Sequence, residues 1–221
     1  MPVSDKNIKV LKAFFLIKRQ AGKFKVPSVT LFSLSNNPYK VLISCILSLR
    51  TKDKTTIEAS NRLFKVAVTP KDMVGLSVRD IEKIIYPVGF YRNKSKVISV
   101  LSLKIINDFK GQVPGNIDDL LSLRGVGRKT ANLVLGLGFK IPAICVDTHV
   151  HRISNRLGWI KTNSPEETEK ELGKIFPKRM WIGLNTTLVA FGQNLCVPVS
   201  PFCRICSVGK FCRKNGVMKT R

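Results

Sequence analysis

The sequence predicts an all-α fold. Apolar residues recur at helical spacing from the start of the chain, where Ile8, Leu11 and Phe14 or Phe15 mark the apolar face of a first amphipathic helix. No segment alternates apolar and polar residues as a half-buried strand does. Hydrophobic residues make up 44% of the 221 residues, which is enough for a packed core and excludes a disordered basic chain.

The expected helix boundaries follow from capping and turn residues. Asn36, Asn37 and Pro38 precede a strongly apolar segment, which we expect to form a central buried helix. Ser164 and Pro165 start another helix, because a serine cap and a proline at the first helical position are typical of helix N-termini. The predicted helices are 39–49, 55–64, 78–85, 93–109, 117–123, one from about 128, 147–157, one from 164, and 180–191.

The charge of the chain favours a polyanionic partner. There are 38 Lys and Arg residues against 14 Asp and Glu, giving a formal net charge of +24. On a folded chain such a charge indicates nucleic acid most simply, with a merely basic protein as the alternative. No run of about 18 apolar residues is present, so we expect no membrane span. We expect a cytoplasmic or nuclear protein, in which thiols stay reduced or bind metal.

A glycine turn separates two of the predicted helices. Gly125 and Gly127 allow a tight turn and a close approach of the backbone to a ligand, next to a helix N-terminus that favours anions. Arg124 and Arg128 flank the two glycines. On a basic chain this arrangement is typical of a helix-hairpin-helix, which holds the DNA backbone without reading sequence. An ordinary turn between two helices is the alternative interpretation.

Lys129 lies in the first turn of the helix that follows. A lysine held as the neutral amine is a nucleophile that can form a Schiff base, and the positive charges of Arg128 and the helix N-terminus favour that form. A lysine that binds phosphate is the alternative.

Asp147 is a single carboxylate that follows an apolar segment at a predicted helix start. It can cap the helix, face a positive centre, or do both, because the cap can hold the side chain in place. His149 and His151 are two positions apart and therefore point to different faces of the helix. This spacing disfavours a metal site built on both, so we expect packing or phosphate contacts.

Four of the six cysteines lie in one short stretch with the spacing C-x6-C-x2-C-x5-C. Four thiolates in one loop suit zinc or an iron–sulfur cluster. Structural zinc sites usually use two Cys-x2-Cys pairs, and only one is present here, so the spacing favours a [4Fe–4S] cluster over zinc. Cys45 and Cys145 lie in apolar contexts and are expected to pack in the core. The candidate ligands are Cys196, Cys203, Cys206 and Cys212.

Three motifs in this order resemble the endonuclease III family of helix-hairpin-helix DNA glycosylases. They are LRGVGRKTAN (residues 123–132), VDTHVHRISNRL (residues 146–157) and the cysteine loop (residues 196–212). The resemblance extends from about Asn36 to Cys212. The stretch IYPVGFYRNK (residues 85–94) is more similar to archaeal and eukaryotic members than to the enterobacterial ones.

The resemblance implies two helical lobes that flank a DNA-binding cleft. One lobe is a six-helix barrel over residues 31–141, with the helix-hairpin-helix at about 116–136. The other lobe combines residues 1–30 with 142–221 and carries the [4Fe–4S] cluster at 196–212. The resemblance favours a monomer that acts on double-stranded DNA, and it implies the cytoplasm at the nucleoid for a prokaryotic protein or the nucleus for a eukaryotic one.

The resemblance also implies the chemistry. The enzyme flips a damaged pyrimidine out of the duplex, and Lys129 matches the family nucleophile that attacks C1′ of the sugar. Asp147 matches the carboxylate that stabilises the cationic sugar. The resulting Schiff base permits β-elimination, which nicks the strand at the damaged pyrimidine or at an abasic site. The reaction is that of a bifunctional DNA glycosylase and AP lyase for oxidised pyrimidines.

Two residues depart from the bacterial family pattern. Arg50 stands where bacterial members carry a Gln that fills the gap left by the flipped base, and Phe90 stands at a second gap-filling position that is commonly Leu. Both side chains can fill a gap and stack on bases. We expect Tyr91 to line the same rim. Basic side chains expected along the cleft are Arg50, Lys52, Arg92 and Lys94, and those expected at the cysteine loop are Arg204 and Arg213.

Two other functions remain open from the sequence. One is a glycosylase of the same superfamily with a different base specificity. The other is a non-catalytic iron–sulfur protein that binds DNA or senses redox state. The second needs neither Lys129 nor Asp147, so the presence of both residues disfavours it.

Overall fold

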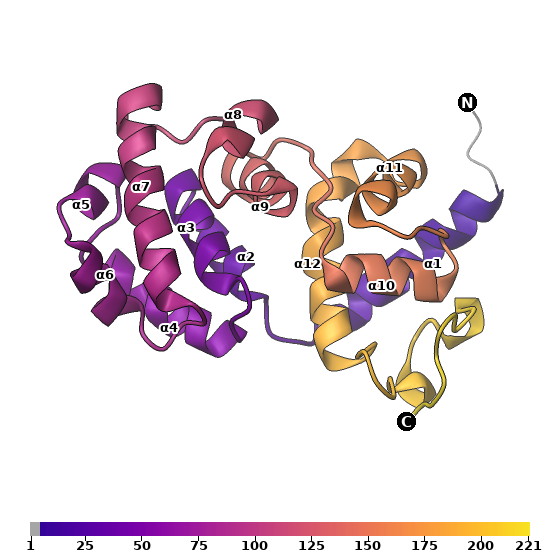
Figure 1. Ribbon diagram of the computed structural model, residues 1–221. Helices are drawn as coiled ribbons and strands as arrows, with labels where there is room; N and C mark the ends of the chain where they lie inside the picture. The colour runs from indigo at the N-terminus through magenta and orange to yellow at the C-terminus, as the bar shows by residue number, and fades with distance from the viewer. Residues whose placement is uncertain (1–4) are drawn as a thin grey trace. The chain divides into compact units, whose positions relative to one another are not determined.

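The computed structural model describes residues 5–221 and confirms the all-α prediction, because these residues form helices and contain no strand (Figure 1). None of the helices in this range is long and apolar enough to cross a membrane. The α-helices are α1 (Asp5–Ala21), α2 (Ser28–Ser33), α3 (Pro38–Ser48), α4 (Asp53–Phe64), α5 (Pro70–Val74), α6 (Val78–Ile85), α7 (Tyr91–Phe109), α8 (Ile117–Ser122), α9 (Arg128–Leu133), α10 (Thr148–Leu157), α11 (Pro165–Ile175) and α12 (Trp181–Asn194). Shorter elements are a π-helix, η1 (Val134–Gly138), and 3-10 turns at η2 (Lys178–Met180), η3 (Cys203–Ile205) and η4 (Gly209–Phe211).

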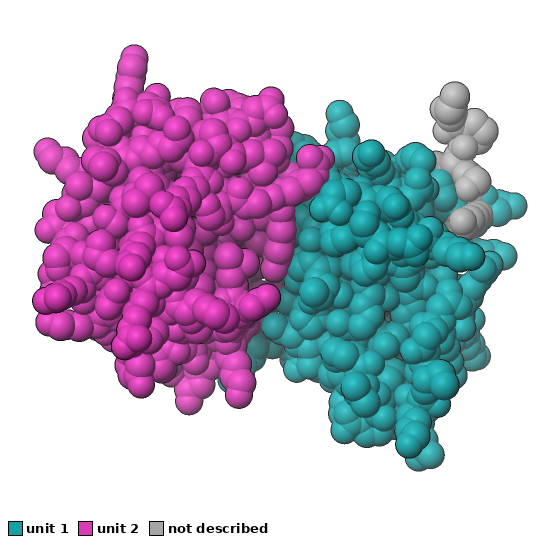
Figure 2. Space-filling view, in the orientation of Figure 1, with its two compact units in different colours: residues 1–26, 142–221 teal, residues 27–141 magenta. Residues whose placement is uncertain are grey.

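The chain divides into two compact units, coloured separately in Figure 2. Unit 2 is the continuous segment Pro27–Ile141, and unit 1 combines residues 1–26 with 142–221. Unit 2 therefore holds α2 to α9 and η1, and unit 1 holds α1 together with α10 to α12 and the cysteine loop.

Helix α3 is the centre of unit 2. Asn37 caps it by accepting hydrogen bonds from the backbone N–H groups of Tyr39 and Lys40, and Pro38 occupies the first turn, as the sequence predicts. Every residue from Val41 to Leu47 is buried, because α2, α4, α7, α9 and η1 all pack around this helix. The Tyr39 hydroxyl is bonded to the Ser102 hydroxyl of α7 at 2.6 Å, so the buried polar atoms are paired.

The core of unit 1 lies among α1, α10 and α12. Phe14 of α1 packs edge-on against Trp159 and Phe176, with ring centroids 6.5 and 5.2 Å away. The predicted apolar face of α1 is partly wrong, because the side chains of Ile8 and Phe15 are 39% and 57% exposed. The buried stripe is instead Val10, Ala13, Phe14, Ile17 and Ala21, which also follows the helical period and covers the core.

Candidate functional site

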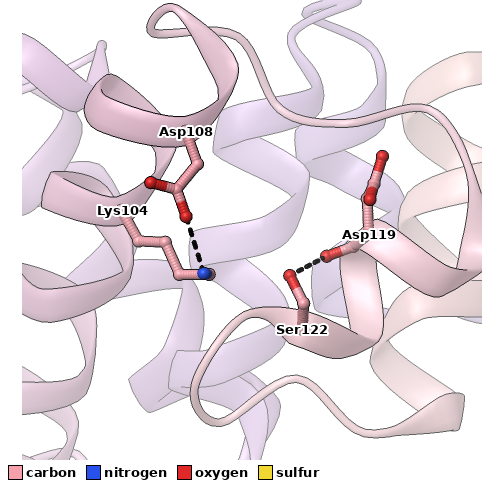
Figure 3. Close-up of polar contacts among 4 residues, drawn as sticks. All are labelled: Lys104, Asp108, Asp119 and Ser122. Carbon is pink, nitrogen blue, oxygen red and sulfur yellow. Dashed lines mark hydrogen bonds and ion pairs between the residues drawn. The ribbon is translucent and has the colours of Figure 1, made fainter.

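The glycine turn joins α8 to α9 and has the geometry expected of a hairpin between two helices. Asn116 caps α8 by accepting the N–H of Asp119, and the Ser122 hydroxyl donates to the Asp119 carbonyl at 2.8 Å in the last turn of α8 (Figure 3). Figure 3 also shows the ion pair between Lys104 and Asp108 on α7, at 2.7 Å. The bonds of Asn116 and Ser122 define α8, the helix that leads into the turn.

The two glycines of the turn have different roles. Gly125 has φ +82°, and a Cβ there would lie 2.6 Å from Cγ1 of Val97 in α7, so this position requires glycine for both conformation and space. Gly127 has φ −95° and caps α9, and a Cβ there would meet nothing within 4 Å. The open space at Gly127 lets a ligand reach the backbone. The predicted contact residues Arg124, Gly125, Gly127 and Arg128 are all exposed.

Lys129 is the second residue of α9, and its side chain is exposed. The charge of Lys129 acts on the buried thiol of Cys45 in α3, where it favours the thiolate. Burial dominates there and raises the pKa of Cys45 to about 12, so Cys45 is a neutral core thiol, as the sequence predicts. The turn therefore presents Lys129 outward, two residues after the open Gly127.

Helix α9 continues into the π-helix η1, which the sequence analysis missed. A Cβ on Gly138 would lie 3.1 Å from Cα of Pro38, so η1 packs closely against the start of α3. Single π-turns occur often beside functional sites. The pair of glycines in residues 134–138 is the signal that could have indicated a wider turn.

Asp147 caps α10, which confirms the structural part of its prediction. Its Oδ1 accepts hydrogen bonds from the N–H groups of His149 and Val150, both at 2.9 Å. Both bonds end on the same oxygen and fix the side chain, which is half-buried. His149 and His151 have separate partners, Arg152 and Thr168, as expected for side chains on different faces.

Arg50 and Phe90 meet face to face in unit 2. The guanidinium carbon of Arg50 lies 5.5 Å from the centroid of the Phe90 ring, in cation–π contact. Both residues have left-handed backbones, with φ +51° and +58°, and both side chains are exposed. Tyr91 packs edge-on against Tyr86 and under Arg92. The structure thus brings together the two predicted gap-filling residues, whereas the contacts of Tyr91 are with Tyr86 and Arg92.

Lys94 corrects the expected distribution of surface charge. Its side chain is buried in α7 and its ammonium donates to the carbonyls of Leu47 and Leu49 and to Oγ1 of Thr51, at 2.8, 2.5 and 3.1 Å. Burial lowers the pKa of Lys94 from 10.5 to about 8. Its position in the sequence could have indicated this burial. Lys94 precedes Val97 and Ile98 by three and four residues and therefore shares their buried face of the helix.

The four clustered cysteines line one pocket in unit 1. Burial raises the pKa of the Cys206 thiol, and the charges of Cys196, Cys212 and Cys203 raise it further, so all four sulfurs lie within electrostatic range of one another. Among residues 5–221, no three His, Cys, Asp or Glu side chains converge closely enough to hold a single metal ion.

The pocket also supplies hydrogen-bond donors to sulfur. The N–H of Lys214 donates to Cys212 Sγ at 3.3 Å, and Arg156 Nη1 donates to Cys196 Sγ at 3.5 Å. Arg156 is buried in α10, lines the pocket, and has its Nε without a hydrogen-bond partner. A buried cation beside four thiols fits an anionic group bound through sulfur. Arg156 was not among the residues predicted from the sequence, although it lies on the buried face of α10.

Comparison with known proteins assigns the family. Residues 43–178 match the family model "HhH-GPD superfamily base excision DNA repair protein". The chain is 47% identical to the endonuclease III of Thermotoga maritima over 188 residues, which covers 84% of this chain and 88% of that relative. The chain belongs to the endonuclease III family. It is a base-excision DNA glycosylase, as the sequence predicts.

Solved structures of endonuclease III are similar over most of the chain. A non-covalent endonuclease III–DNA complex matches with a TM-score of 0.83 at 33% identity, covering 94% of this chain and 95% of that one. A trapped endonuclease III–DNA covalent intermediate with an estranged adenine matches with a TM-score of 0.76 at 40% identity, covering 80% and 84%. Both are complexes with DNA, and one of them is covalent.

Proposed function

We propose that this endonuclease III family member is a bifunctional glycosylase and AP lyase for oxidised pyrimidines in double-stranded DNA, with Lys129 as its nucleophile. The observation that carries the proposal is the exposed Lys129 at the start of α9, two residues after the open Gly127 of the hairpin. A relative 40% identical to this chain was trapped as a covalent intermediate with DNA, which agrees with a nucleophile on the protein.

The reaction begins when the Lys129 amine attacks C1′ of the damaged nucleotide. The C1′–N bond breaks with its electron pair leaving on the base, which takes up a proton. The amine then loses a proton and the sugar ring opens to a Schiff base. Loss of a C2′ proton expels the 3′ phosphate, which is β-elimination, and water finally hydrolyses the Schiff base and frees Lys129.

Asp147 supports the first step through its charge. As the base leaves, positive charge develops on the sugar, and a carboxylate held in a fixed position stabilises it. The bonds from His149 and Val150 to Oδ1 give Asp147 that fixed position.

We infer that Cys196, Cys203, Cys206 and Cys212 hold a [4Fe–4S] cluster. The four thiols line one pocket, have N–H donors to sulfur and lie beside the buried Arg156, which fits an anionic cluster. The sequence spacing favours a cluster over the zinc alternative, because it contains only one Cys-x2-Cys pair and structural zinc sites usually use two. The cluster would fix the loop and contribute charge. Brown protein with broad visible absorbance and about four irons per chain is expected, and colourless protein with one zinc would contradict it.

A nicking assay tests the proposed activity. The substrate is a duplex oligonucleotide with one thymine glycol, and we expect the free base and a strand nicked by β-elimination. Lys129→Gln should abolish both products, and Asp147→Asn should slow them by about 100-fold or more. Protein that binds the duplex without releasing base or nicking would contradict the proposal and support the non-catalytic alternative. Activity on a different damaged base would retain the chemistry and change the specificity.

A further inference from the structure

The Arg50–Phe90 pair is held in a conformation that its own residues do not favour. Arg50 and Phe90 are distant in sequence but in contact, and both have left-handed backbones. Non-glycine residues keep this conformation only where the surrounding structure enforces it, and such residues gather at functional sites. The cation–π contact joins the two side chains but does not fix either backbone. The support must therefore come from residues that contact the two loops.

One hydrogen-bond network encloses both loops. Thr51 Oγ1 accepts the N–H of Gly89 at 3.1 Å and donates to the Leu49 carbonyl at 3.2 Å. Arg50 is thereby fixed on both sides, and Phe90 is fixed through the preceding glycine. A Cβ on Gly89 would lie 2.6 Å from the Arg50 carbonyl oxygen, so the two loops are already in direct backbone contact.

Lys94 is the centre of this network. Its ammonium uses three donors on the carbonyls of Leu47 and Leu49 and on Thr51 Oγ1, which lie at the end of α3 and in the loop that follows it. The residue belongs to α7, which begins directly after Phe90. A single buried side chain thus ties the helix that follows Phe90 to the loop that contains Arg50.

We propose that Lys94 is a positioning residue that holds Arg50 and Phe90 ready to enter the DNA duplex. The inference rests on the proposed function. Lys94 does not touch DNA itself, because its side chain is buried. Its loss should impair the step in which the damaged nucleotide leaves the duplex and should spare the chemistry at Lys129.

Borohydride trapping on two forms of one oligonucleotide separates these steps. An abasic site in a duplex requires the strand to be opened, whereas the same site in a single strand does not. For Lys94→Met we expect the duplex trapping rate to fall about 10-fold to 100-fold while the single-strand rate stays within about twofold. Lys96→Met, which removes an exposed charge from the same helix, is the matched control and should leave the ratio of the two rates unchanged.

Further variants show whether Lys94 acts through the pair. In an Arg50→Ala, Phe90→Ala background, adding Lys94→Met should lower the trapping rate on duplex DNA hardly any further. Lys94→Arg, which retains donors, should restore part of the duplex rate. If Lys94→Met does not fold, Thr51→Val takes its place, and a smaller fall in the same ratio is expected.

Three outcomes would overturn the inference. One is an unchanged ratio of duplex to single-strand rates in Lys94→Met or, where that variant does not fold, in Thr51→Val. Another is an equal fall on both substrates. The third is that Lys94→Met lowers the duplex trapping rate as much in the Arg50→Ala, Phe90→Ala background as it does in the wild type. Wild-type protein that traps on neither DNA would instead overturn the proposed function, and this inference with it.

Discussion

At the scale of single residues, Asp147 combines a structural and a chemical role. The cap on α10 requires an oxygen acceptor, which Asn supplies as well as Asp, whereas stabilising a cationic sugar requires the negative charge. The two roles can therefore be separated by substitution. Lys94 also has two separable effects. Its hydrogen bonds hold the loops of Arg50 and Phe90, and its charge makes stability depend on pH.

We expect Asp147→Asn to retain the stability of the wild type and lose activity. Asp147→Ala should lose activity and also about 1 kcal/mol of unfolding free energy, because the N–H groups of His149 and Val150 lose their acceptor. Denaturant unfolding beside a nicking assay measures both. Full activity in Asp147→Asn would show that the charge is not used.

Lys94 should make stability depend on pH in alkaline solution. Burial lowers its pKa from 10.5 to about 8, so between these values the unfolded chain binds a proton that the folded chain has lost. The free energy of unfolding of the wild type, relative to Lys94→Met, should therefore rise as the pH increases from about 8 to 10.5. Below pH 8 the difference should be flat. A difference that falls over this range would contradict the buried placement.

At the scale of elements, the hairpin between α8 and α9 depends on two glycines that are not equivalent. Gly125 is confined by Val97 and by its positive φ, whereas Gly127 is open to solvent at the cap of α9. The first glycine shapes the turn, and the second leaves its backbone accessible. Their substitution should affect different properties.

Gly125→Ala should destabilise unit 2 by about 1–3 kcal/mol, because the added methyl group overlaps Val97 and the backbone is left-handed. Gly127→Ala should cost less stability and weaken duplex DNA binding, because the methyl group projects into the space that a phosphate would occupy. Thermal unfolding and fluorescence anisotropy with duplex DNA compare the two. Equal stability losses would contradict the distinct roles.

Local signals predicted most of the elements. The limits of α6 and the caps at Asn37, Asp147 and Ser164 follow from short-range hydrogen bonding, which the sequence specifies directly. The buried face of α1 could not be predicted, since two neighbouring stripes of that helix are apolar and only the packing of unit 1 selects one. The π-helix η1 depends on close contact with Pro38, which is about 100 residues away in sequence.

The candidate site was predictable to a similar degree. The residues that carry the chemistry lie within short motifs, so Lys129, Asp147 and the four cysteines could be named from the sequence. Lys94 and Arg156 act through contacts with distant segments, and a basic residue on a basic chain is first expected at the surface. Their burial follows only from tertiary packing.

At the scale of the whole molecule, the net charge of +24 contains separate contributions. Lys94 and Arg156 are buried and add little to the surface, whereas Arg124 and Arg128 are exposed at the hairpin. Most of the other Lys and Arg residues lie outside the hairpin and the buried positions. We assign them to nonspecific association with DNA, which depends on charge alone.

The salt dependence of DNA binding measures the exposed charges. Each phosphate contact changes the slope of log K against log salt by about −0.9 on duplex DNA, so Arg124→Gln should make the slope shallower by about that amount. Lys104→Gln is the control, because Asp108 already neutralises this lysine at 2.7 Å. Equal slopes for wild type and Arg124→Gln would remove Arg124 from the interface.

We predict that Lys129 becomes covalently bonded to the sugar of the damaged nucleotide. Borohydride reduction with a thymine glycol duplex, followed by proteolysis and mass spectrometry, locates that bond directly. We predict a single DNA-linked peptide with the adduct on the Lys129 nitrogen, and no adduct from Lys129→Gln. An adduct on another amine, or wild-type cleavage of the strand without any trapped species, would contradict the account.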